Sequence, residues 1–487
     1  MHRFATKRIR IAPKTAMSIA FRDYLLTQVT CTFLGFIDKS KNDSDVIHLE
    51  SLNPNEVDAI IIVSPNHFHA IYQDCQNFID VSKLYLVHIQ NQSYHITQHI
   101  EKKPINLIEY YAKQLDDAKN ERQGIAFISK GFIGSNNKFF YLYCIRHNIP
   151  CIMITDNQEQ LQALNQYDLP CVKLDTEEGD KAIAQAKYLI FDQGNYTYFY
   201  ISSDQITIQL WHGVGLKKMA PHTHITYDYF VSTSQWTNET NFKHIFKAKH
   251  FVDYGYPRND FLLQKKDDDL DLLFCDYAIY QTIQNQTFSK IFLYMPTTRE
   301  YLFTAESPKK EALFPLDLET LNKDLQTNNT LLIIKLHPFV MQFFSQQTPE
   351  EPFSHIRFHI ADGDIYPILK YTDILITDYS SVVYDFLLLD RPIIFFDYDR
   401  EQYEQNMGGF LFDYDEYSPG QKVQTQDELV KALFKKDNSH RERKMIKNKF
   451  LGEENPSRLF NSNIALNTLL QKHHERIVDT KKSIDAE

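Results

Sequence analysis

The most constraining feature of this chain is the regular alternation of short apolar runs, rich in Val, Ile, Phe and Tyr, with longer amphipathic segments. Apolar runs of roughly four to eight residues are typical of strands buried on both faces of a parallel sheet, and the longer segments suit crossover helices. This pattern predicts the α/β class. Because 487 residues exceed the usual domain size of about 100–200 residues, we expect more than one sheet.

We divide the chain into an N-terminal Rossmann-like block (1–115), a second block (120–265), a third block (275–470) and a polar tail (472–487). The charged stretch 264–271 is interpreted as a linker. Strands are expected at 8–12, 32–37, 59–63, 124–129, 150–155, 188–192, 206–211, 229–232, 291–295, 331–336, 374–377 and 392–396. Two similar α/β blocks in tandem predict a cleft between them, because open α/β sheets bind ligands beyond the carboxyl ends of their strands.

The N-terminal block lacks the sequence signature of a dinucleotide site. Asp38 follows an expected strand, where a ribose-binding acid would lie. However, no glycine lies between Ile11 and Leu34, so the Gly-rich phosphate turn is missing. We therefore expect a structural or partner-docking role for this block rather than NAD binding.

The formal net charge of −11 argues against general affinity for nucleic acid, so an anionic ligand must be held by a local site. The six cysteines show no metal-ligand spacing, and we expect a cytoplasmic protein. No apolar stretch of about 18 residues occurs, so any membrane contact is expected to be peripheral. We interpret the basic runs 243–250 and 435–449 as solvated helix faces, with contact to an anionic membrane surface as the alternative.

The first strand-end motif is Trp-His-Gly-Val-Gly-Leu-Lys-Lys at 211–218. His212 can accept a proton near neutral pH, Gly213 lets the backbone approach a ligand closely, and Lys217 can meet phosphate charge. A histidine packed beside a turn is the alternative, but the surrounding residues favour the functional interpretation.

Two further motifs supply cationic and hydroxyl groups. In Tyr-Gly-Tyr-Pro-Arg-Asn-Asp at 254–260, Arg258 is expected to project from a rigid turn as a bidentate ligand of phosphate or carboxylate. Thr297, Thr298 and Arg299 follow another expected strand and suit a diphosphate or sugar hydroxyls. The alternatives are a surface arginine and a capped helix start.

A fourth motif, Lys-Leu-His-Pro at 335–338, ends the expected strand 331–336. His337 can donate a hydrogen bond to a phosphate oxygen, whereas Lys335 is expected to lie beside the strand. A packed, non-functional histidine is the alternative.

In the fifth motif, an apolar strand runs into Asp378, Tyr379, Ser380 and Ser381, and a helical pattern follows. One of the two serines is therefore expected at a helix N-terminus, where backbone N–H groups and the helix dipole bind anions. An ordinary N-cap serine is the alternative. Asp385, one turn further, is a candidate ligand of a ribose or acceptor hydroxyl.

In this order, the motifs resemble those of the CDP-glycerol glycerophosphotransferase family, the enzymes of teichoic acid and related capsule polymer synthesis. The resemblance covers roughly residues 124–465. The matching strings are Trp211-His212-Gly213, 255–260, 296–299, 335–338 and 377–381.

The resemblance implies a GT-B-like pair of Rossmann-like domains facing a central cleft, with the N-terminal block as an extra domain. The second block would bind the acceptor and the third CDP-glycerol. His212 and His337 would be the catalytic pair. The residues expected to bind substrate are Gly213, Lys217, Arg258, Thr297, Thr298, Arg299, Asp378, Ser380, Ser381 and Asp385.

The implied reaction transfers glycerol phosphate from CDP-glycerol to an acceptor hydroxyl and releases CMP, with His212 as the general base. The acceptor would be lipid-linked or an oligosaccharide, and capsule-synthesis enzymes are candidate partners. No cofactor is expected to be required and no metal site is predicted, although Mg²⁺ could accompany the diphosphate.

Two departures from the family pattern concern the transferred polyol. Val214-Gly215 stand where the family commonly has Thr-Pro, and Thr298 stands where it usually has Trp. CDP-ribitol is therefore an alternative donor. A GT-B glycosyltransferase using a nucleotide sugar and a non-catalytic scaffold in capsule assembly are further alternatives, although the presence of both histidines and both arginines argues against the scaffold.

Overall fold

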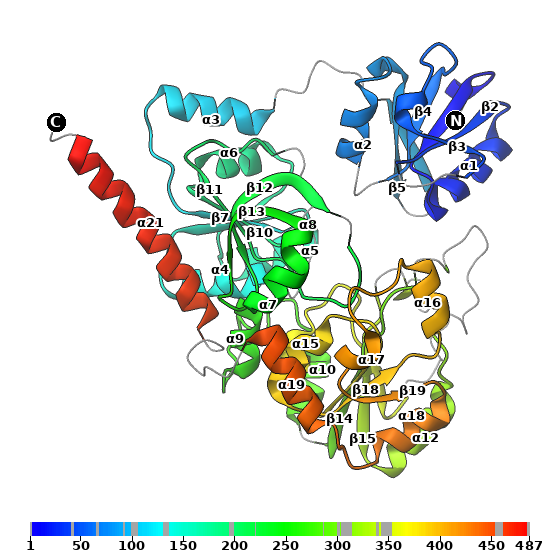
Figure 1. The fold of residues 1–487 in the computed structure, drawn as a ribbon, viewed down its shortest axis with the longest axis vertical. Coiled ribbons are helices and arrows are strands. Elements are labelled where there is room, and N and C mark those ends of the chain that lie inside the picture. Colours follow the sequence, from blue (N-terminus) through cyan, green and yellow to red (C-terminus); the bar gives the residue numbers. More distant parts are fainter. Residues whose placement is uncertain are drawn as a thin grey trace. The chain divides into compact units, whose positions relative to one another are not determined.

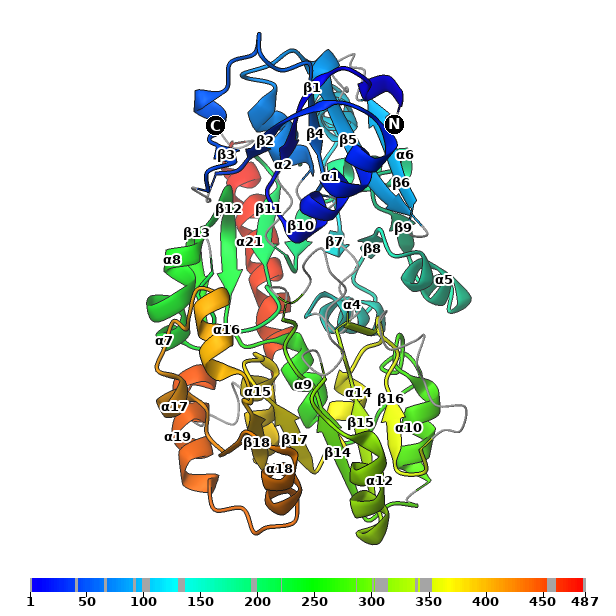
Figure 2. The same cartoon turned by 90° about the vertical axis from the view of Figure 1, so that its right-hand side faces the viewer.

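The computed structural model shows two compact units, of which the first comprises mainly residues 1–110 and the second residues 111–194, 201–298 and 314–487 (Figures 1 and 2). The structure describes residues 2–39, 43–64, 68–90, 93–98, 106–129, 136–193, 199–219, 221–285, 287–299, 302, 314–337, 340–341, 353–452 and 461–484.

The first unit is a six-stranded sheet in the order β3-β2-β1-β4-β5-β6, in which only β6 runs antiparallel to its neighbour. Its strands are β1 (Arg8–Ala12), β2 (Thr32–Ile37), β3 (Val46–Ile47), β4 (Ala59–Ile62), β5 (Leu84–Gln90) and β6 (Ser93–Gln98). The helices of this unit include α1 (Ala16–Gln28) and α2 (Phe68–Cys75). The alternating side chains of β1 enter two separate apolar clusters, so both faces of the sheet are covered. The three strands expected here are confirmed.

The turn after β1 is closed by its own polar groups. Asp38 accepts a hydrogen bond from the Lys14 N–H at 3.0 Å. Thr15 and Ser18 form a reciprocal capping box that bonds two N–H groups at the start of α1. The groups that a ribose and a diphosphate would require are thus engaged within the turn, which agrees with the missing Gly-rich motif.

The second unit contains two lobes, each built on a parallel sheet. The N-lobe sheet has the order β13-β12-β11-β10-β7-β8-β9. Its strands are β7 (Ile125–Ser129), β8 (Cys151–Thr155), β9 (Cys171–Lys173), β10 (Tyr188–Phe191), β11 (Ile206–Gln209), β12 (His222–Val231) and β13 (Phe246–Val252). Its helices are α3 (Leu107–Asp117), α4 (Asn136–Arg146), α5 (Gln158–Gln166), α6 (Glu177–Gln185), α7 (Gln235–Thr237), α8 (Lys243–Ile245) and α9 (Pro257–Leu263).

The interpretation of residues 243–250 as a helix face is wrong. Only the short α8 is helical, and the edge strand β13 follows it. The physical reason is Phe246, which is buried and packs edge-on against Trp211 with ring centroids 4.7 Å apart. Because this side chain completes the core beside β12, the segment pairs with that strand despite its charges.

The C-lobe sheet has the order β16-β15-β14-β17-β18-β19, and all neighbouring strands are parallel. Its strands are β14 (Lys290–Tyr294), β15 (Thr330–Ile334), β16 (Ile356–Phe358), β17 (Ile374–Thr377), β18 (Ile393–Phe396) and β19 (Gln421–Val423). Its helices include α10 (Tyr277–Gln284), α12 (Leu318–Thr327), α14 (Tyr366–Leu369), α15 (Val382–Phe386), α16 (Arg400–Asn406), α17 (Tyr414–Tyr417), α18 (Gln426–Leu433) and α19 (His440–Leu451).

The final described helix, α21 (Ser462–Ile484), returns from the C-lobe to pack along the N-lobe (Figures 1 and 2). Leu466, Leu469 and Leu470 are buried in the N-lobe core, and the Tyr188 hydroxyl donates to the Leu470 carbonyl at 2.9 Å. The expected boundary, with a third block to 470 and a polar tail from 472, is therefore wrong. The three leucines attach this segment to the N-lobe, and the helix continues to Ile484.

The charged stretch expected as a linker is held between the lobes. Asp267 pairs with Lys370 of the C-lobe, and Arg146 of α4 pairs with Asp268 and Asp271 at 2.7 Å each. Among the described helices, none is both long and apolar enough to cross a lipid bilayer.

Candidate active site

The loop after β11 carries His212 in a constrained backbone. Trp211 has a φ of +51° and Gly213 a φ of +149°, values that few L-residues adopt. The side chain of Asn136, at the start of α4, donates to the carbonyls of Leu210 and Trp211 at 3.1 and 3.0 Å. These bonds hold the loop against the N-lobe.

The His212 ring is oriented by two contacts. Nδ1 lies 2.9 Å from the Asp192 carbonyl oxygen and therefore donates its proton to it, because a carbonyl can only accept. The Trp211 ring packs against the imidazole with centroids 3.9 Å apart. In this tautomer Nε2 carries the lone pair. Burial lowers the pKa of His212 to about 4, and the positive charges of Arg258 and His222 act in the same direction. The imidazole is thus neutral at pH 7, as a general base must be.

At Gly213 the two lobes meet beside His212. A Cβ atom at Gly213 would lie 2.9 Å from the Ser381 Oγ and 3.3 Å from the Arg258 Nη2. Gly213 follows the carboxyl end of β11 and Ser381 follows that of β17. The contact therefore brings the carboxyl edges of the two sheets together, where the strand-end rule predicts a ligand site.

The loops that follow β14 and β17 are tied together by Asp378. Its carboxylate accepts the Thr297 N–H at 2.9 and 3.1 Å, and the Thr377 hydroxyl donates to the Met295 carbonyl at 2.7 Å. Asp378 is buried and braces this loop. The structure thus places Thr297 and Thr298 beside the segment that carries the two serines.

Ser380 and Ser381 directly precede the five-residue helix α15. Ser381 occupies the N-cap position, as expected, but its side chain makes no capping hydrogen bond. Its hydroxyl instead lies beside Gly213, in the contact described above.

Arg258 and Asp385 do not have the surroundings expected of substrate ligands. Both are buried, and the Arg258 Nη2 lies 2.8 Å from the Asp385 Oδ2. The other terminal nitrogen, Nη1, donates to the His212 carbonyl at 2.7 Å, and the Tyr366 hydroxyl donates to the same Asp385 oxygen at 2.8 Å. The expected rigid turn is wrong, because Arg258 lies in the first turn of α9. Its guanidinium does meet a carboxylate, but that of Asp385 across the two lobes.

His337 lies at the same sheet edge as Thr297 and Asp378. The register aligns Ile334 with Tyr294 and Tyr294 with Ile376, so the segments after the three strands emerge together. The His337 side chain is exposed, and its carbonyl accepts the N–H groups of Val340 and Met341 at 2.9 and 3.0 Å.

Lys335 lies beside the strand, as predicted, and its ammonium donates to the Ala361 carbonyl at 2.9 Å. Burial lowers the pKa of Lys335 to about 8. This lysine therefore anchors the strand end, two residues before His337.

Lys217 lies against the C-lobe. Its ammonium is 5.6 Å from the centre of the Tyr403 ring, and the neighbouring Leu216 carbonyl accepts the Leu411 N–H at 2.6 Å. The Arg299 side chain is buried and belongs to the first unit.

Sequence reasoning missed three residues that shape this site. Asp192 ends an expected strand, so the strand-end rule could have found it. Asn136 opens a helix and was detectable as a polar residue at a helix start. Tyr366 carries no local signal, because its contact with Asp385 exists only in the folded lobe.

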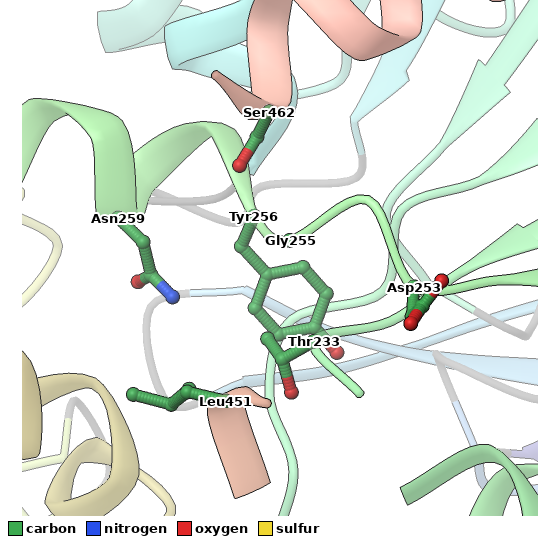
Figure 3. A pocket seen from close by; sticks show the side chains of 7 residues that line it. All are labelled: Thr233, Asp253, Gly255, Tyr256, Asn259, Leu451 and Ser462. Carbon is green, nitrogen blue, oxygen red and sulfur yellow. The ribbon is translucent and has the colours of Figure 1, made fainter. Parts of the chain in front are cut away.

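A small pocket lies at the start of α9 (Figure 3). The pocket has about 10 Å³ of free space, which is room for one water molecule and too little for a nucleotide. The residues that line it are Thr233, Asp253, Gly255, Tyr256, Asn259, Leu451 and Ser462. Among the described residues, no group of three or more His, Cys, Asp and Glu side chains could hold a metal ion.

Comparison with known proteins shows which family this chain resembles. The model of the CDP-glycerol:poly(glycerophosphate) glycerophosphotransferase family matches residues 110–455. A teichoic acid poly(glycerol phosphate) polymerase of Bacillus spizizenii is 32% identical over 278 residues, which are 53% of this chain and 68% of the relative. The corresponding Bacillus subtilis polymerase is 30% identical over 52% of this chain, which spans only 35% of that protein.

Two further similarities concern the polyol and the fold. A teichoic acid poly(ribitol-phosphate) polymerase of Bacillus spizizenii is 27% identical over 50% of this chain and 41% of the relative. The solved wall teichoic acid polymerase TagF has a TM-score of 0.58 at 22% identity, covering 76% of this chain and 93% of that chain. The predicted GT-B-like fold is confirmed. Because the family model matches residues 110–455, which include both lobes, the chain belongs to the CDP-glycerol:poly(glycerophosphate) glycerophosphotransferase family.

Proposed function

We propose that this protein transfers glycerol phosphate from CDP-glycerol to an acceptor hydroxyl and releases CMP. Family membership supports the reaction class. The observation that carries the proposal is the neutral His212, whose Nδ1 proton is held by the Asp192 carbonyl, beside the contact between the two sheet edges. A histidine in this tautomer can take a proton from a hydroxyl at Nε2.

In the proposed step, the acceptor oxygen attacks the β-phosphorus of CDP-glycerol and forms a new phosphoester bond. The bond from that phosphorus to the bridging oxygen breaks, and CMP leaves with the electron pair. The hydroxyl proton passes to His212. We assign stabilisation of the phosphate charge to proposed ligands of the diphosphate, namely His337, Lys217, Thr297, Thr298, Ser380 and Ser381.

The donor is tested by incubating the purified chain with CDP-glycerol, CDP-ribitol or a UDP-sugar and measuring nucleotide release. We expect CMP from CDP-glycerol and no UDP release from the UDP-sugar. The ribitol arm is included because a relative is a ribitol-phosphate polymerase. Faster CMP release from CDP-ribitol would identify CDP-ribitol as the donor. Release of UDP alone would show that the protein is a glycosyltransferase and overturn the proposed reaction.

The acceptor is proposed to be a lipid-linked or oligosaccharide hydroxyl, and mass spectrometry of the product would count the units added. We also propose peripheral contact with the inner face of the membrane. The exposed Arg441 and Lys444 of α19 support this contact, because basic side chains are attracted to anionic lipids. We also propose that capsule-synthesis enzymes dock on the first unit.

We predict that turnover requires no metal cofactor. Removing divalent cations with EDTA is expected to leave most CMP release intact, because charge on the diphosphate can be met by the proposed cationic ligands. Loss of turnover that added Mg²⁺ restores would show instead that the ion accompanies the substrate.

A further inference from the structure

A buried chain of hydrogen bonds runs from the C-lobe to the backbone of His212. It starts at the Tyr366 hydroxyl, which donates to the Asp385 Oδ2 at 2.8 Å. The same oxygen lies 2.8 Å from the Arg258 Nη2, and the Arg258 Nη1 donates to the His212 carbonyl at 2.7 Å. The Arg258 and Asp385 side chains are only 2% and 4% exposed, so this contact is shielded from solvent.

We propose that Asp385 and Tyr366 of the C-lobe position His212 of the N-lobe through Arg258, so that contact between the lobes completes the alignment of the base. This inference rests on the proposed function, because it assigns a role in positioning the same base. None of these three residues is proposed to touch substrate.

The arrangement of the donors argues for positioning. His212 is held at two points, its ring by the Asp192 carbonyl and its backbone by Arg258. Asn136 fixes the preceding carbonyls from within the N-lobe. Arg258 therefore links the His212 carbonyl to α14 and α15 of the C-lobe. A guanidinium whose two terminal nitrogens are engaged at 2.7 and 2.8 Å offers little to a phosphate.

The ion pair also sets the electrostatic environment of His212. Arg258 from α9 and His222 from β12 both act on this imidazole electrostatically and disfavour its protonation. Neutralising Arg258 should therefore raise the pKa of His212. Neutralising Asp385 leaves the guanidinium charge uncompensated and should lower that pKa further. Substitutions of the two partners of this ion pair are thus expected to shift the pKa of His212 in opposite directions.

The test compares Asp385→Asn, Arg258→Gln, Arg258→Lys and Tyr366→Phe by kcat, KM and the pH profile of CMP release. We expect Asp385→Asn and Arg258→Gln to lower kcat by up to about 100-fold, the cost of misplacing a catalytic group, with KM for CDP-glycerol little changed. The acid limb of kcat/KM should move to higher pH in Arg258→Gln and to lower pH in Asp385→Asn. Arg258→Lys keeps the charge and should keep the limb near its wild-type position.

Tyr371→Phe is the matched control for Tyr366→Phe. Tyr371 also donates to a carboxylate, that of Asp267 at 2.8 Å, but it lies outside this chain of bonds. Only Tyr366→Phe should lower kcat. A large rise in KM for CDP-glycerol at constant kcat would overturn the positioning role. So would acid limbs of kcat/KM that move in the same direction in Asp385→Asn and Arg258→Gln.

The His212 pKa can also be read without turnover, by NMR titration of the imidazole signals assigned with a His212→Gln variant. Opposite shifts in Asp385→Asn and Arg258→Gln are expected, and their absence would overturn the inference. Wild-type protein that releases no CMP would instead refute the proposed function, while the NMR result would still decide the coupling.

Discussion

Replacing His212 by alanine should lower kcat for CMP release by about 10²–10⁴-fold, the usual contribution of a general base. The ring that would accept the proton is lost, while the Asn136 and Arg258 contacts to the loop carbonyls involve backbone atoms and can remain. Binding of CDP-glycerol should therefore change little. The measurement is steady-state kinetics with CDP-glycerol and a defined acceptor.

The matched control is His147→Ala. His147 also places Nδ1 on a backbone carbonyl, that of Tyr143 at 2.8 Å, but it is exposed at the end of α4. Its removal should leave kcat at the wild-type value. Turnover retained by His212→Ala would remove His212 from the mechanism.

The pH dependence of kcat/KM of the wild-type protein is a second test of His212 as the general base. Because burial lowers the pKa of His212 to about 4, the imidazole is unprotonated throughout the neutral range. The ratio kcat/KM should stay level as the pH falls from about 8 to 6 and decline only as the pH approaches that pKa. A limb near the ordinary histidine value of about 6.5 would contradict this assignment.

Replacing Lys138 by alanine should lower the free energy of unfolding of the second unit by about 3–5 kcal/mol. Lys138 pairs with Asp364 across the two lobes and also donates to the Asp271 carbonyl at 2.8 Å. Its loss leaves the fully buried Asp364 carboxylate without its cation. Urea denaturation followed by tryptophan fluorescence reports on this unit alone, since both tryptophans, Trp211 and Trp236, lie in it.

Lys181→Ala provides the control for this change. Lys181 pairs with Glu177 one turn away on α6, and both side chains are about half exposed. Such a pair contributes about 0.2–0.5 kcal/mol. If both substitutions cost the same free energy, the contact between Lys138 and Asp364 does not hold the lobes together.

The sequence predicts the central strands well because their burial on both faces leaves long apolar runs. The expected strands do not include β3, β5, β6, β9, β13, β16 and β19, and all of these except β5 are the outermost strands of their sheets. Edge strands are half covered, so polar residues interrupt the apolar pattern. The register of the central strands then placed His337, Thr297 and Asp378 at one edge, as the strand-end rule predicts.

The pairing of Arg258 with Asp385 was beyond sequence reasoning. The two residues are 127 positions apart and belong to different lobes, so no local pattern relates them. Each motif alone favoured a phosphate or hydroxyl ligand, because a strand-end arginine or aspartate has the same local signature in either role. Only the packing of α9 against α14 and the nearby C-lobe residues distinguishes the two.

The return of α21 to the N-lobe has a consequence for biosynthesis. Leu466, Leu469 and Leu470 complete an apolar core whose other members lie mostly between residues 125 and 231. A nascent chain on the ribosome therefore exposes that face for as long as the intervening 230 or so residues are being translated, and seals it only after the last helix has emerged.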